Sequence, residues 1–239
     1  MFTKTAELYD LVYGFKAYND EASKLHELIR KYKVSSGNTL LDIGCGTGHH
    51  IQYLKRLYEV QGLDLDNGLL EVARQRNPEL TFHCADMTDF ALDATFDVIT
   101  CLFSSIGYVQ TVAGLESAIS RMAVHLKPGG VLFVVPWFTP ETYTSGVVHA
   151  LTVERPDLKL CRMNVSKVEG GVSILDFHYL LGTPAGVEHF TEEHRLGLFS
   201  QEEHIQAFRK SGLDVSYDHG GDQDGLLARG MYIGIRPLK

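Results

Sequence analysis

The segment Thr39-Leu40-Leu41-Asp42-Ile43 is a short, almost entirely apolar run that ends directly in a glycine-rich loop. A run of this kind is typical of a parallel strand that is buried on both of its faces. Further apolar runs cover residues 58–64, 80–84, 96–102 and 131–135. Stretches with helical spacing lie among them and cover residues 47–57, 67–76 and 112–126. This alternation predicts an α/β fold whose parallel strands are joined by right-handed crossovers.

The pattern changes after Pro136. The following residues predict an antiparallel sheet, in which Glu169-Gly170-Gly171 forms a hairpin turn. The predicted strands of this sheet cover residues 150–155, 160–168, 172–181 and 187–198. A helix at 201–211 and strands at 213–217 and 231–236 then return to the first pattern, and residues 5–33 predict a short helix followed by a longer one.

We therefore expect a single domain that spans residues 1–239. Residues 1–136 and 199–239 should form a doubly wound, mostly parallel, Rossmann-like sheet, and residues 137–198 an antiparallel β insertion after the fifth strand. Ligands of such sheets bind beyond the carboxyl ends of the strands, so the functional residues should lie there.

Composition excludes several classes of function. A formal net charge of −8 argues against a general nucleic-acid binder, which needs surfaces rich in Lys and Arg. The four cysteines form no CxxC pair, and the spacing of Cys and His predicts no metal site. Neither an apolar signal-peptide core nor an apolar run long enough to span a membrane occurs, so we expect a cytoplasmic protein.

The loop after the first strand places Gly44, Gly46 and Gly48 at alternate positions. Glycines there allow a sharp turn and let a ligand approach the backbone. The spacing differs from the GxGxxG of dinucleotide-binding loops, and the Gly-Lys-Ser/Thr of a phosphate-binding loop is missing. Asp42 also disfavours a diphosphate and suits a ligand with a cationic amine. The alternative is a tight strand–helix turn without a ligand.

Acidic residues also end the next two strands. Asp64 is placed to accept hydrogen bonds from both hydroxyls of a ribose. Asp86 is placed to accept from an adenine amino group, with Met87 packed on the ring. The alternatives are a helix N-cap, for which Asp66 and Asn67 are better placed than Asp64, and a plain loop aspartate at position 86. Together these residues follow the order that one bound nucleoside requires.

These features resemble the class I S-adenosylmethionine-dependent methyltransferases. The resemblance covers roughly residues 8–135 and includes Asp42-Ile43-Gly44-Cys45-Gly46-Thr47-Gly48, Phe103-Ser104-Ser105-Ile106-Gly107-Tyr108 and His125-Leu126-Lys127-Pro128-Gly129-Gly130. It implies S-adenosylmethionine as the cofactor and S-adenosylhomocysteine as its product. The implied cofactor-binding residues are Tyr13, Lys16, Tyr18, Asp42, Gly44, Cys45, Gly46, Gly48, Asp64, Leu65, Asp86, Met87, Leu102 and Phe103.

A narrower similarity, to the N,N-dimethyltransferases of nucleotide-linked amino sugars, runs along nearly the whole chain. It includes Tyr9-Asp10-Leu11-Val12-Tyr13, Pro136-Trp137-Phe138-Thr139-Pro140-Glu141-Thr142, His189-Phe190 and Arg229-Gly230-Met231-Tyr232. This similarity implies a dTDP-sugar with a 3-amino group and an insertion that covers the active site and pairs subunits into a homodimer. Candidate substrate-binding residues are Ser104, Ser105, Tyr108, Trp137, Arg162, His178, Arg195 and Arg229, of which the arginines suit a diphosphate.

Methyl transfer from a sulfonium needs a neutral amine that is aligned with the methyl group. A weak base assists, and Tyr13 and His125 are the candidate catalytic residues. The resemblance places the His of the His-Leu-x-Pro-Gly-Gly segment near the site, although His125 precedes strand five and is equally suited to stabilise a helix C-terminus. Two other functions remain open: methylation of another small metabolite at N or O, and cofactor binding without turnover.

Overall fold

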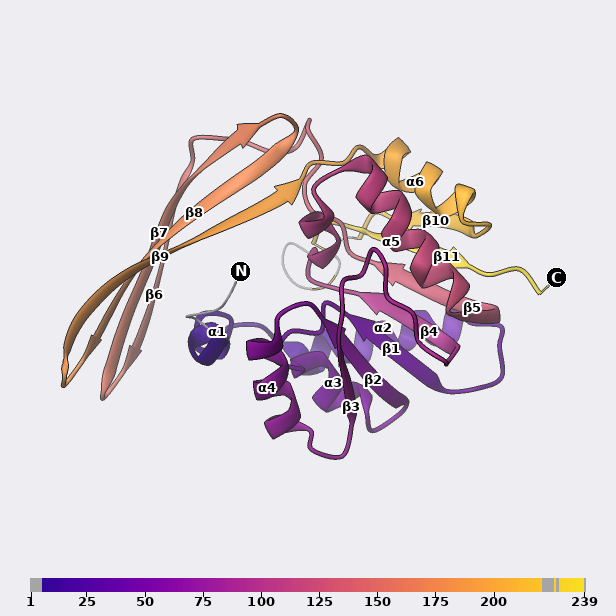
Figure 1. Ribbon diagram of the computed structural model, residues 1–239, viewed down its shortest axis with the longest axis horizontal. Coiled ribbons are helices and arrows are strands. Elements are labelled where there is room, and N and C mark those ends of the chain that lie inside the picture. Colours follow the sequence, from indigo (N-terminus) through magenta and orange to yellow (C-terminus); the bar gives the residue numbers. More distant parts are fainter. Residues whose placement is uncertain (1–5, 221–225, 227, 239) are drawn as a thin grey trace.

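The computed structural model describes residues 6–220, 226 and 228–238, and within these ranges the strands form two sheets (Figure 1). The larger sheet has seven strands in the order β10-β11-β5-β4-β1-β2-β3. Their bounds are β1 Thr39–Ile43, β2 Glu59–Asp64, β3 Thr81–Cys84, β4 Phe96–Cys101, β5 Leu126–Val134, β10 Asp214–Asp218 and β11 Met231–Ile235. Strands β1 to β5 pair in parallel, and β11 runs antiparallel to both β5 and β10.

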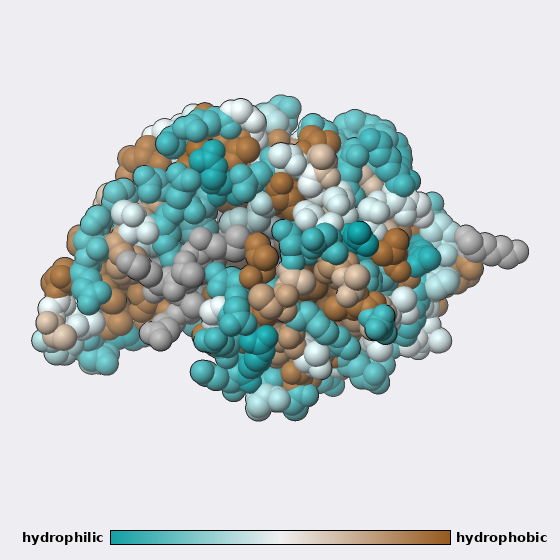
Figure 2. All heavy atoms as spheres, in the orientation of Figure 1, coloured by the Kyte–Doolittle hydropathy of each residue, from teal (hydrophilic) through white to brown (hydrophobic). Residues whose placement is uncertain are grey.

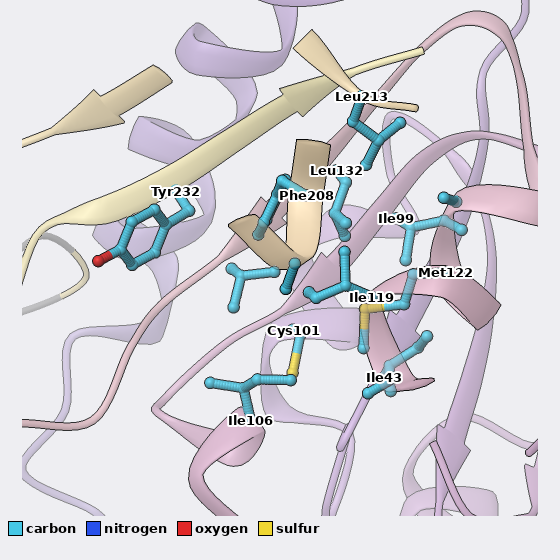
Figure 3. Close-up of a cluster of buried hydrophobic side chains, with 14 of the residues drawn as sticks. Ile43, Ile99, Cys101, Ile106, Ile119, Met122, Leu132, Phe208, Leu213 and Tyr232 are labelled. Carbon is cyan, nitrogen blue, oxygen red and sulfur yellow. The ribbon is translucent and has the colours of Figure 1, made fainter. Parts of the chain in front are cut away.

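Helices cover both faces of this sheet, as the continuous apolar strands predict. Leu41 and Ile43 of β1 belong to the core cluster that includes side chains of α5 and α6, part of which Figure 3 shows. Leu40, on the opposite face of β1, belongs to the cluster that includes side chains of α2, α3 and α4. The predicted doubly wound α/β fold is therefore confirmed. The helices are α1 Ala6–Val12, α2 Tyr18–Tyr32, α3 His49–Leu54, α4 Asn67–Arg76, α5 Val112–Val124 and α6 Gln201–Lys210.

The second sheet is the antiparallel insertion that was predicted after the fifth strand. Its order is β6-β7-β8-β9, with bounds Val148–Arg155, Leu158–Glu169, Val172–Thr183 and Gly186–Gly197. The predicted hairpin joins β7 to β8, and Gly170 and Gly171 adopt positive φ angles of 58° and 80° there. Figure 1 shows this sheet standing to one side of the larger sheet, above α1. Val12 of α1 packs with Leu160, Phe177 and Tyr179 on the inner face of the insertion.

Two local features differ from the sequence prediction. Strand β5 begins at Leu126 rather than at residue 131, because Leu126 pairs with Phe96 before a register shift. A short 3-10 helix, η1 (Ser105–Val109), follows β4 and was not predicted. Phe103 and Ser104 lead into it with φ angles of 50° and 63°, a backbone conformation that non-glycine residues rarely adopt. None of the described helices is long and apolar enough to cross a membrane.

Asp97, near the start of β4, holds the loop before β1 against the amino ends of the parallel strands. Its buried carboxylate accepts hydrogen bonds from the backbone N–H groups of Gly37 and Thr39, from Thr39 Oγ1 at 2.7 Å and from Lys127 Nζ at 2.8 Å. Burial alone would raise the pKa of Asp97, but the hydrogen bonds from Lys127 and Thr39 outweigh it and hold that pKa well below its usual range.

We predict that Asp97→Asn lowers the free energy of unfolding at pH 7 by about 2–3 kcal/mol, because charge-assisted hydrogen bonds are lost. A folded-state pKa below the unfolded one stabilises the protein above the unfolded pKa of about 4, and this contribution is lost as the pH falls through the folded pKa. Urea denaturation should therefore show a difference between wild type and variant that shrinks below about pH 4. Asp93→Asn, at an exposed position nearby, is the control; equal midpoints for all three proteins would contradict the role of Asp97.

Candidate active site

A large cavity of about 1510 Å³ lies at the carboxyl ends of the parallel strands. Its walls come from the loop after β1, the ends of β2 and β3, the segment around η1, the N-terminal segment and the inner face of the insertion. Figure 2 shows a recess in the outline between the insertion, at the left, and the main body. A second cavity of about 30 Å³ shares Tyr9, Gly44, Phe103 and Ser105 with the first. The site therefore lies at the edge of the sheet where ligands of such folds bind.

The glycine loop bends back over β2. The backbone N–H groups of Gly44 and Cys45 both donate to the carbonyl oxygen of Leu63, at 2.7 and 3.1 Å. A Cβ atom on Gly44 would lie 2.6 Å from Ser105 Cβ, whereas one on Gly46 would find its nearest atom, Tyr9 Oη, at 3.9 Å. Gly46 thus leaves open space at the cavity wall, where the backbone can approach a ligand. Gly48 lines neither cavity and precedes α3 with a φ of 75°.

Asp64 joins the end of β2 to this loop. Its two carboxylate oxygens accept from the N–H groups of Gly46 at 2.8 Å and Asp66 at 2.9 Å, and its side chain lines the large cavity. Burial raises the pKa of this carboxyl. Asp66, not Asp64, caps α4, because its carboxylate accepts from Gly68 and Leu69. Each carboxylate oxygen of Asp64 keeps a further acceptor position for a ligand hydroxyl.

Asp86, Met87 and Leu65 extend the same wall. One carboxylate oxygen of Asp86 accepts from the N–H and the hydroxyl of Thr88, both at 2.8 Å, which fixes the side chain after β3. Leu65 is half exposed, at 50%. The ends of β2 and β3 therefore bring a carboxylate pair and two apolar side chains to one cavity, as the sequence predicted.

Asp42 lies deeper, against the small cavity that Tyr18, Cys45 and Leu102 also line. It accepts from Thr100 Oγ1 at 2.7 Å, and burial raises the pKa of Asp42 to about 6. Among the described residues no side chain or backbone group pairs with the buried hydroxyl of Tyr18. An unpaired buried hydroxyl costs free energy unless a ligand or water satisfies it.

The N-terminal segment closes over the cavity and is held by Asp10. This carboxylate accepts from Thr47 Oγ1 at 2.7 Å and pairs with Arg76 and His49. Burial would raise the pKa of Asp10, but the hydrogen bonds from His49, Thr47 and Arg76 lower it to about 2. The same segment carries Lys16, which pairs with Glu21 at 2.7 Å.

The N-terminal segment also contributes aromatic rings to the cavity wall. Tyr13 lies 4.7 Å from Tyr9 and 5.1 Å from Phe103, measured between ring centroids, and Lys16 Nζ lies 4.1 Å from the Phe103 centroid. Sequence reasoning did not single out Tyr9 as a site residue, although its spacing of four from Tyr13 places both on one helical face. Their rings therefore form one wall of the large cavity.

Two of the predicted arginines reach the cavity. Arg162 of β7 donates to Tyr13 Oη at 3.2 Å, and its guanidinium lies 4.5 Å from the ring centroid of Phe177. The guanidinium of Arg229 lies 5.0 Å from the Trp137 ring and 4.4 Å from the Phe138 ring. Burial lowers the pKa of Arg229, and its buried Nε has no hydrogen-bond partner within the part of the chain that the structure describes.

Tyr108, Trp137, Ser104 and Ser105 also line the cavity, but their polar atoms form hydrogen bonds within the protein. Ser104 Oγ donates to the carbonyl of Pro136 at 2.7 Å, and Ser105 Oγ donates to that of Gly44 at 3.4 Å. Trp137 Nε1 donates to Ser173 Oγ at 2.8 Å. These contacts join the loop after β4 to the glycine loop and to the segment after β5, and they join that segment to β8 of the insertion.

The predictions for His178 and Arg195 are wrong, because both side chains lie on the outer face of the insertion. Successive residues of a strand point to opposite faces, and Phe177 of β8 faces inward. His178 accordingly contacts His189 at 3.2 Å across the outer face. Arg195 pairs there with Glu193 at 3.2 Å and with Glu169 at 3.8 Å.

The prediction that His125 lies in the site is also wrong. It caps the carboxyl end of α5, which lies at the amino ends of the parallel strands, opposite the cavity. Its Nε2 accepts from the N–H of Leu92 at 3.0 Å, so Nδ1 carries the proton and donates to the carbonyl of Arg121 at 2.7 Å. The ring stacks on Phe90 at 4.5 Å. His125 is therefore a neutral structural histidine.

Among the described residues no group of three or more His, Cys, Asp or Glu side chains could hold a metal ion. Residues that the sequence did not single out also line the cavity, notably Tyr143 and Asn164. Tyr143 Oη and Asn164 Nδ2 are buried, and no partner for either lies in the described ranges. No local sequence signal marks them, because their position depends on how the insertion packs.

Comparison with known proteins agrees with this geometry. Residues 40–130 match a family model described as a methyltransferase domain. The chain is 40% identical over 238 residues to the dTDP-3-amino-3,6-dideoxy-alpha-D-glucopyranose N,N-dimethyltransferase of Streptomyces fradiae, which covers 98% of this chain and 91% of the relative. It is 38% identical to the dTDP-3-amino-3,4,6-trideoxy-alpha-D-glucopyranose N,N-dimethyltransferase of Streptomyces venezuelae, over 96% of this chain and 97% of the relative.

Solved structures give the same result. DesVI of Streptomyces venezuelae matches with a TM-score of 0.90 and 37% identity over 98% of this chain and 99% of that one. CalS10, an amino pentose methyltransferase from Micromonospora echinaspora solved with S-adenosylmethionine bound, matches with a TM-score of 0.85 and 34% identity over 96% of each chain. The chain therefore belongs to the family of S-adenosylmethionine-dependent N,N-dimethyltransferases of dTDP-linked amino sugars.

Proposed function

We propose that this protein transfers methyl groups from S-adenosylmethionine to the amino group of a dTDP-linked sugar, with the amine at carbon 3. The observation that carries the proposal is one continuous cavity of about 1510 Å³. It joins the strand-end carboxylates to buried polar groups on the insertion, so it has room for a cofactor and a nucleotide sugar together. Two relatives, at 40% and 38% identity, act on 3-amino sugars, while one at 33%, from Saccharopolyspora spinosa, acts on a 4-amino sugar.

The cofactor fits the strand-end side of the cavity. Asp64 would accept from the ribose hydroxyls beside the open backbone of Gly46, and Asp86 would accept from the adenine amino group. The small cavity, with Asp42 and the unpaired hydroxyl of Tyr18, suits the charged methionine end. When bound, the cofactor supplies a methyl group that is activated by a sulfonium charge.

The nucleotide part of the acceptor fits the insertion side. Arg229 Nε, Tyr143 Oη and Asn164 Nδ2 line this side, and each is buried without a partner in the described part of the chain. An unsatisfied buried polar group costs about 1–3 kcal/mol, which a polar ligand would recover. Two guanidinium groups, of Arg162 and Arg229, suit the oxygens of a diphosphate.

The chain's contribution to the reaction is mainly alignment. Tyr13 lies between Phe103 and Arg162 at the cavity wall, where its hydroxyl can orient the acceptor amine toward the cofactor. Alignment of two bound reactants lowers the barrier by several kcal/mol, about 7–11 in well-oriented model reactions.

A homodimer is part of the proposal. The outer face of the insertion exposes apolar side chains on adjacent strands, with exposed fractions of 47% for Met163, 53% for Val165 and 50% for Leu180. Exposed apolar atoms are visible on the insertion in Figure 2. A second copy of the chain would bury them. A cytoplasmic location stays a prediction.

Mass spectrometry of reaction products tests the proposed activity. We expect a gain of two methyl groups on a dTDP-3-amino sugar, and little product from a dTDP-4-amino sugar, a free amino sugar or a hydroxyl-bearing metabolite. If only another small metabolite were methylated, the proposed nucleotide-sugar acceptor would be refuted and that metabolite would be the acceptor. Bound cofactor without any product from the whole panel would show a binding protein without turnover.

We predict that Asp64→Asn weakens S-adenosylmethionine binding about 10- to 100-fold, because hydrogen bonds to a charged acceptor are worth about 1.5–3 kcal/mol. Isothermal titration calorimetry measures the effect. Asp66→Asn is the matched control: asparagine caps helices as well as aspartate, so its affinity should equal that of wild type. Equal affinities for Asp64→Asn and wild type would remove Asp64 from the cofactor site.

We predict that Met163→Glu converts a dimer to a monomer, because it places a charge within the buried interface. Analytical ultracentrifugation measures the mass in solution. Lys24→Glu, on a helix of the main body, is the control and should remain dimeric. A wild-type protein that sediments as a monomer at all concentrations would refute the dimer.

A further inference from the structure

Three polar side chains form a chain that leads from the cavity wall into the protein. Tyr108 of η1 lines the large cavity, and its hydroxyl lies 2.7 Å from Nδ1 of His194 in β9. Nε2 of His194 lies 3.7 Å from a carboxylate oxygen of Glu192 on the same strand. His194 is 2% exposed and Glu192 8% exposed. The chain therefore crosses from the main domain to the insertion without reaching solvent.

Burying an imidazole and a carboxylate is costly unless both are paired and positioned. Here the arrangement is ordered: the ring of Phe177 contacts the His194 ring edge-on, with centroids 5.1 Å apart, and fixes its plane. A hydroxyl, an imidazole and a carboxylate in this spatial order form the arrangement by which hydrolases move a proton away from a reacting group. His194 and Glu192 do not line the cavity, so they can act on a bound ligand only through Tyr108.

The proposed reaction requires that a proton be removed. Alkyl amines are largely protonated near pH 7, and a protonated amine has no lone pair for attack on a methyl group. The primary ammonium must lose one proton before the first methyl transfer, and the secondary ammonium must lose another before the second. A proton acceptor within reach of the amine would therefore speed the reaction.

We propose that Tyr108, His194 and Glu192 form a proton relay that accepts the proton lost by the acceptor amine before each methyl transfer. This inference rests on the proposed function. In the resting relay Tyr108 donates to Nδ1 of neutral His194, whose Nε2–H faces Glu192. The cavity side of the Tyr108 oxygen is then an acceptor for an ammonium N–H.

In the transfer, the N–H bond of the ammonium breaks as its proton binds Tyr108 Oη. The proton that Tyr108 carried moves to His194 Nδ1, which leaves a neutral amine, a neutral tyrosine and an imidazolium beside the Glu192 carboxylate. Charge is conserved, and the new imidazolium is stabilised by that carboxylate. Reversal of the path after product release returns the proton to solvent.

Charged and titratable groups face the relay from several elements. Burial raises the pKa of Tyr108 well above its usual value, and the nearby Tyr13, Asp64, Tyr179 and Glu192 raise it further. The phenolate form of Tyr108 is therefore disfavoured, so Tyr108 accepts one proton only as it donates its own to His194. The charged groups among these neighbours are Asp64 from β2 and Glu192 from β9, and Arg162 from β7 acts on the adjacent Tyr179.

The test compares wild type with His194→Asn, which can keep a hydrogen bond to Tyr108 but cannot take a proton. Single-turnover methyl transfer to a dTDP-3-amino sugar is followed from pH 6 to pH 10. We expect about a 100-fold loss of rate at pH 7 that shrinks below about 10-fold at pH 9–10, where the amine loses its proton unaided. Tyr108→Phe should show the same dependence on pH, with little change in substrate KM.

His204→Asn is the matched control, because His204 is equally buried but does not line the cavity; its pH profile should follow wild type. Thermal melting checks that all variants fold. A rate loss that is constant across pH, or no loss in either His194→Asn or Tyr108→Phe, would overturn the relay. Failure of wild type to methylate any dTDP-amino sugar would instead refute the proposed function, so the two failures are distinguishable.

Discussion

The active site depends on the hydrogen bond between Asp64 and the backbone N–H of Gly46. It joins the end of β2 to the glycine loop of β1 at 2.8 Å, and it lies at the bottom of the large cavity. The loop bends only because glycines tolerate its positive φ angles, and the carboxylate then holds the bend in place. A ligand that binds Asp64 is thereby held next to open backbone. The remaining walls are arranged around this point.

Two further layers complete the enclosure, and each is fastened by polar contacts to the main domain. Asp10 secures α1 to the glycine loop through Thr47 and to α4 through Arg76. The insertion is secured by Trp137, which donates to Ser173, and by the contact between Tyr108 and His194. Because these contacts are few, directional and partly buried, they fix position more than they add stability. The cavity is therefore built from three parts of the chain that lie far apart in sequence.

The sequence predicted the core and the residues that line the strand-end side of the cavity well, because both depend on local patterns. The buried strand at residues 39–43 and the helix at 67–76 have the predicted bounds, and Asp64 and Asp86 line one cavity. The insertion side of the cavity depends on strand register and on contacts between distant segments. His178 was misplaced because adjacent strand residues point to opposite faces, and Tyr108 and His194, 86 residues apart, carry no local sign of their contact. His125 shows that a short motif does not fix which edge of the sheet a residue occupies.

The alternation of side chains along β7, β8 and β9 divides the insertion between two tasks. Inward residues such as Arg162 and Phe177 line the cavity, and inward His194 is buried behind it, while their sequence neighbours Met163, His178 and Arg195 face the outside. Substitutions at every second position can therefore change which acceptor fits while leaving the outer surface intact. Insertion or deletion of a single residue within one of these strands would exchange the two surfaces beyond that point. The acceptor specificity of this sheet can therefore change by substitution of side chains, whereas a change in strand length would disrupt both of its faces.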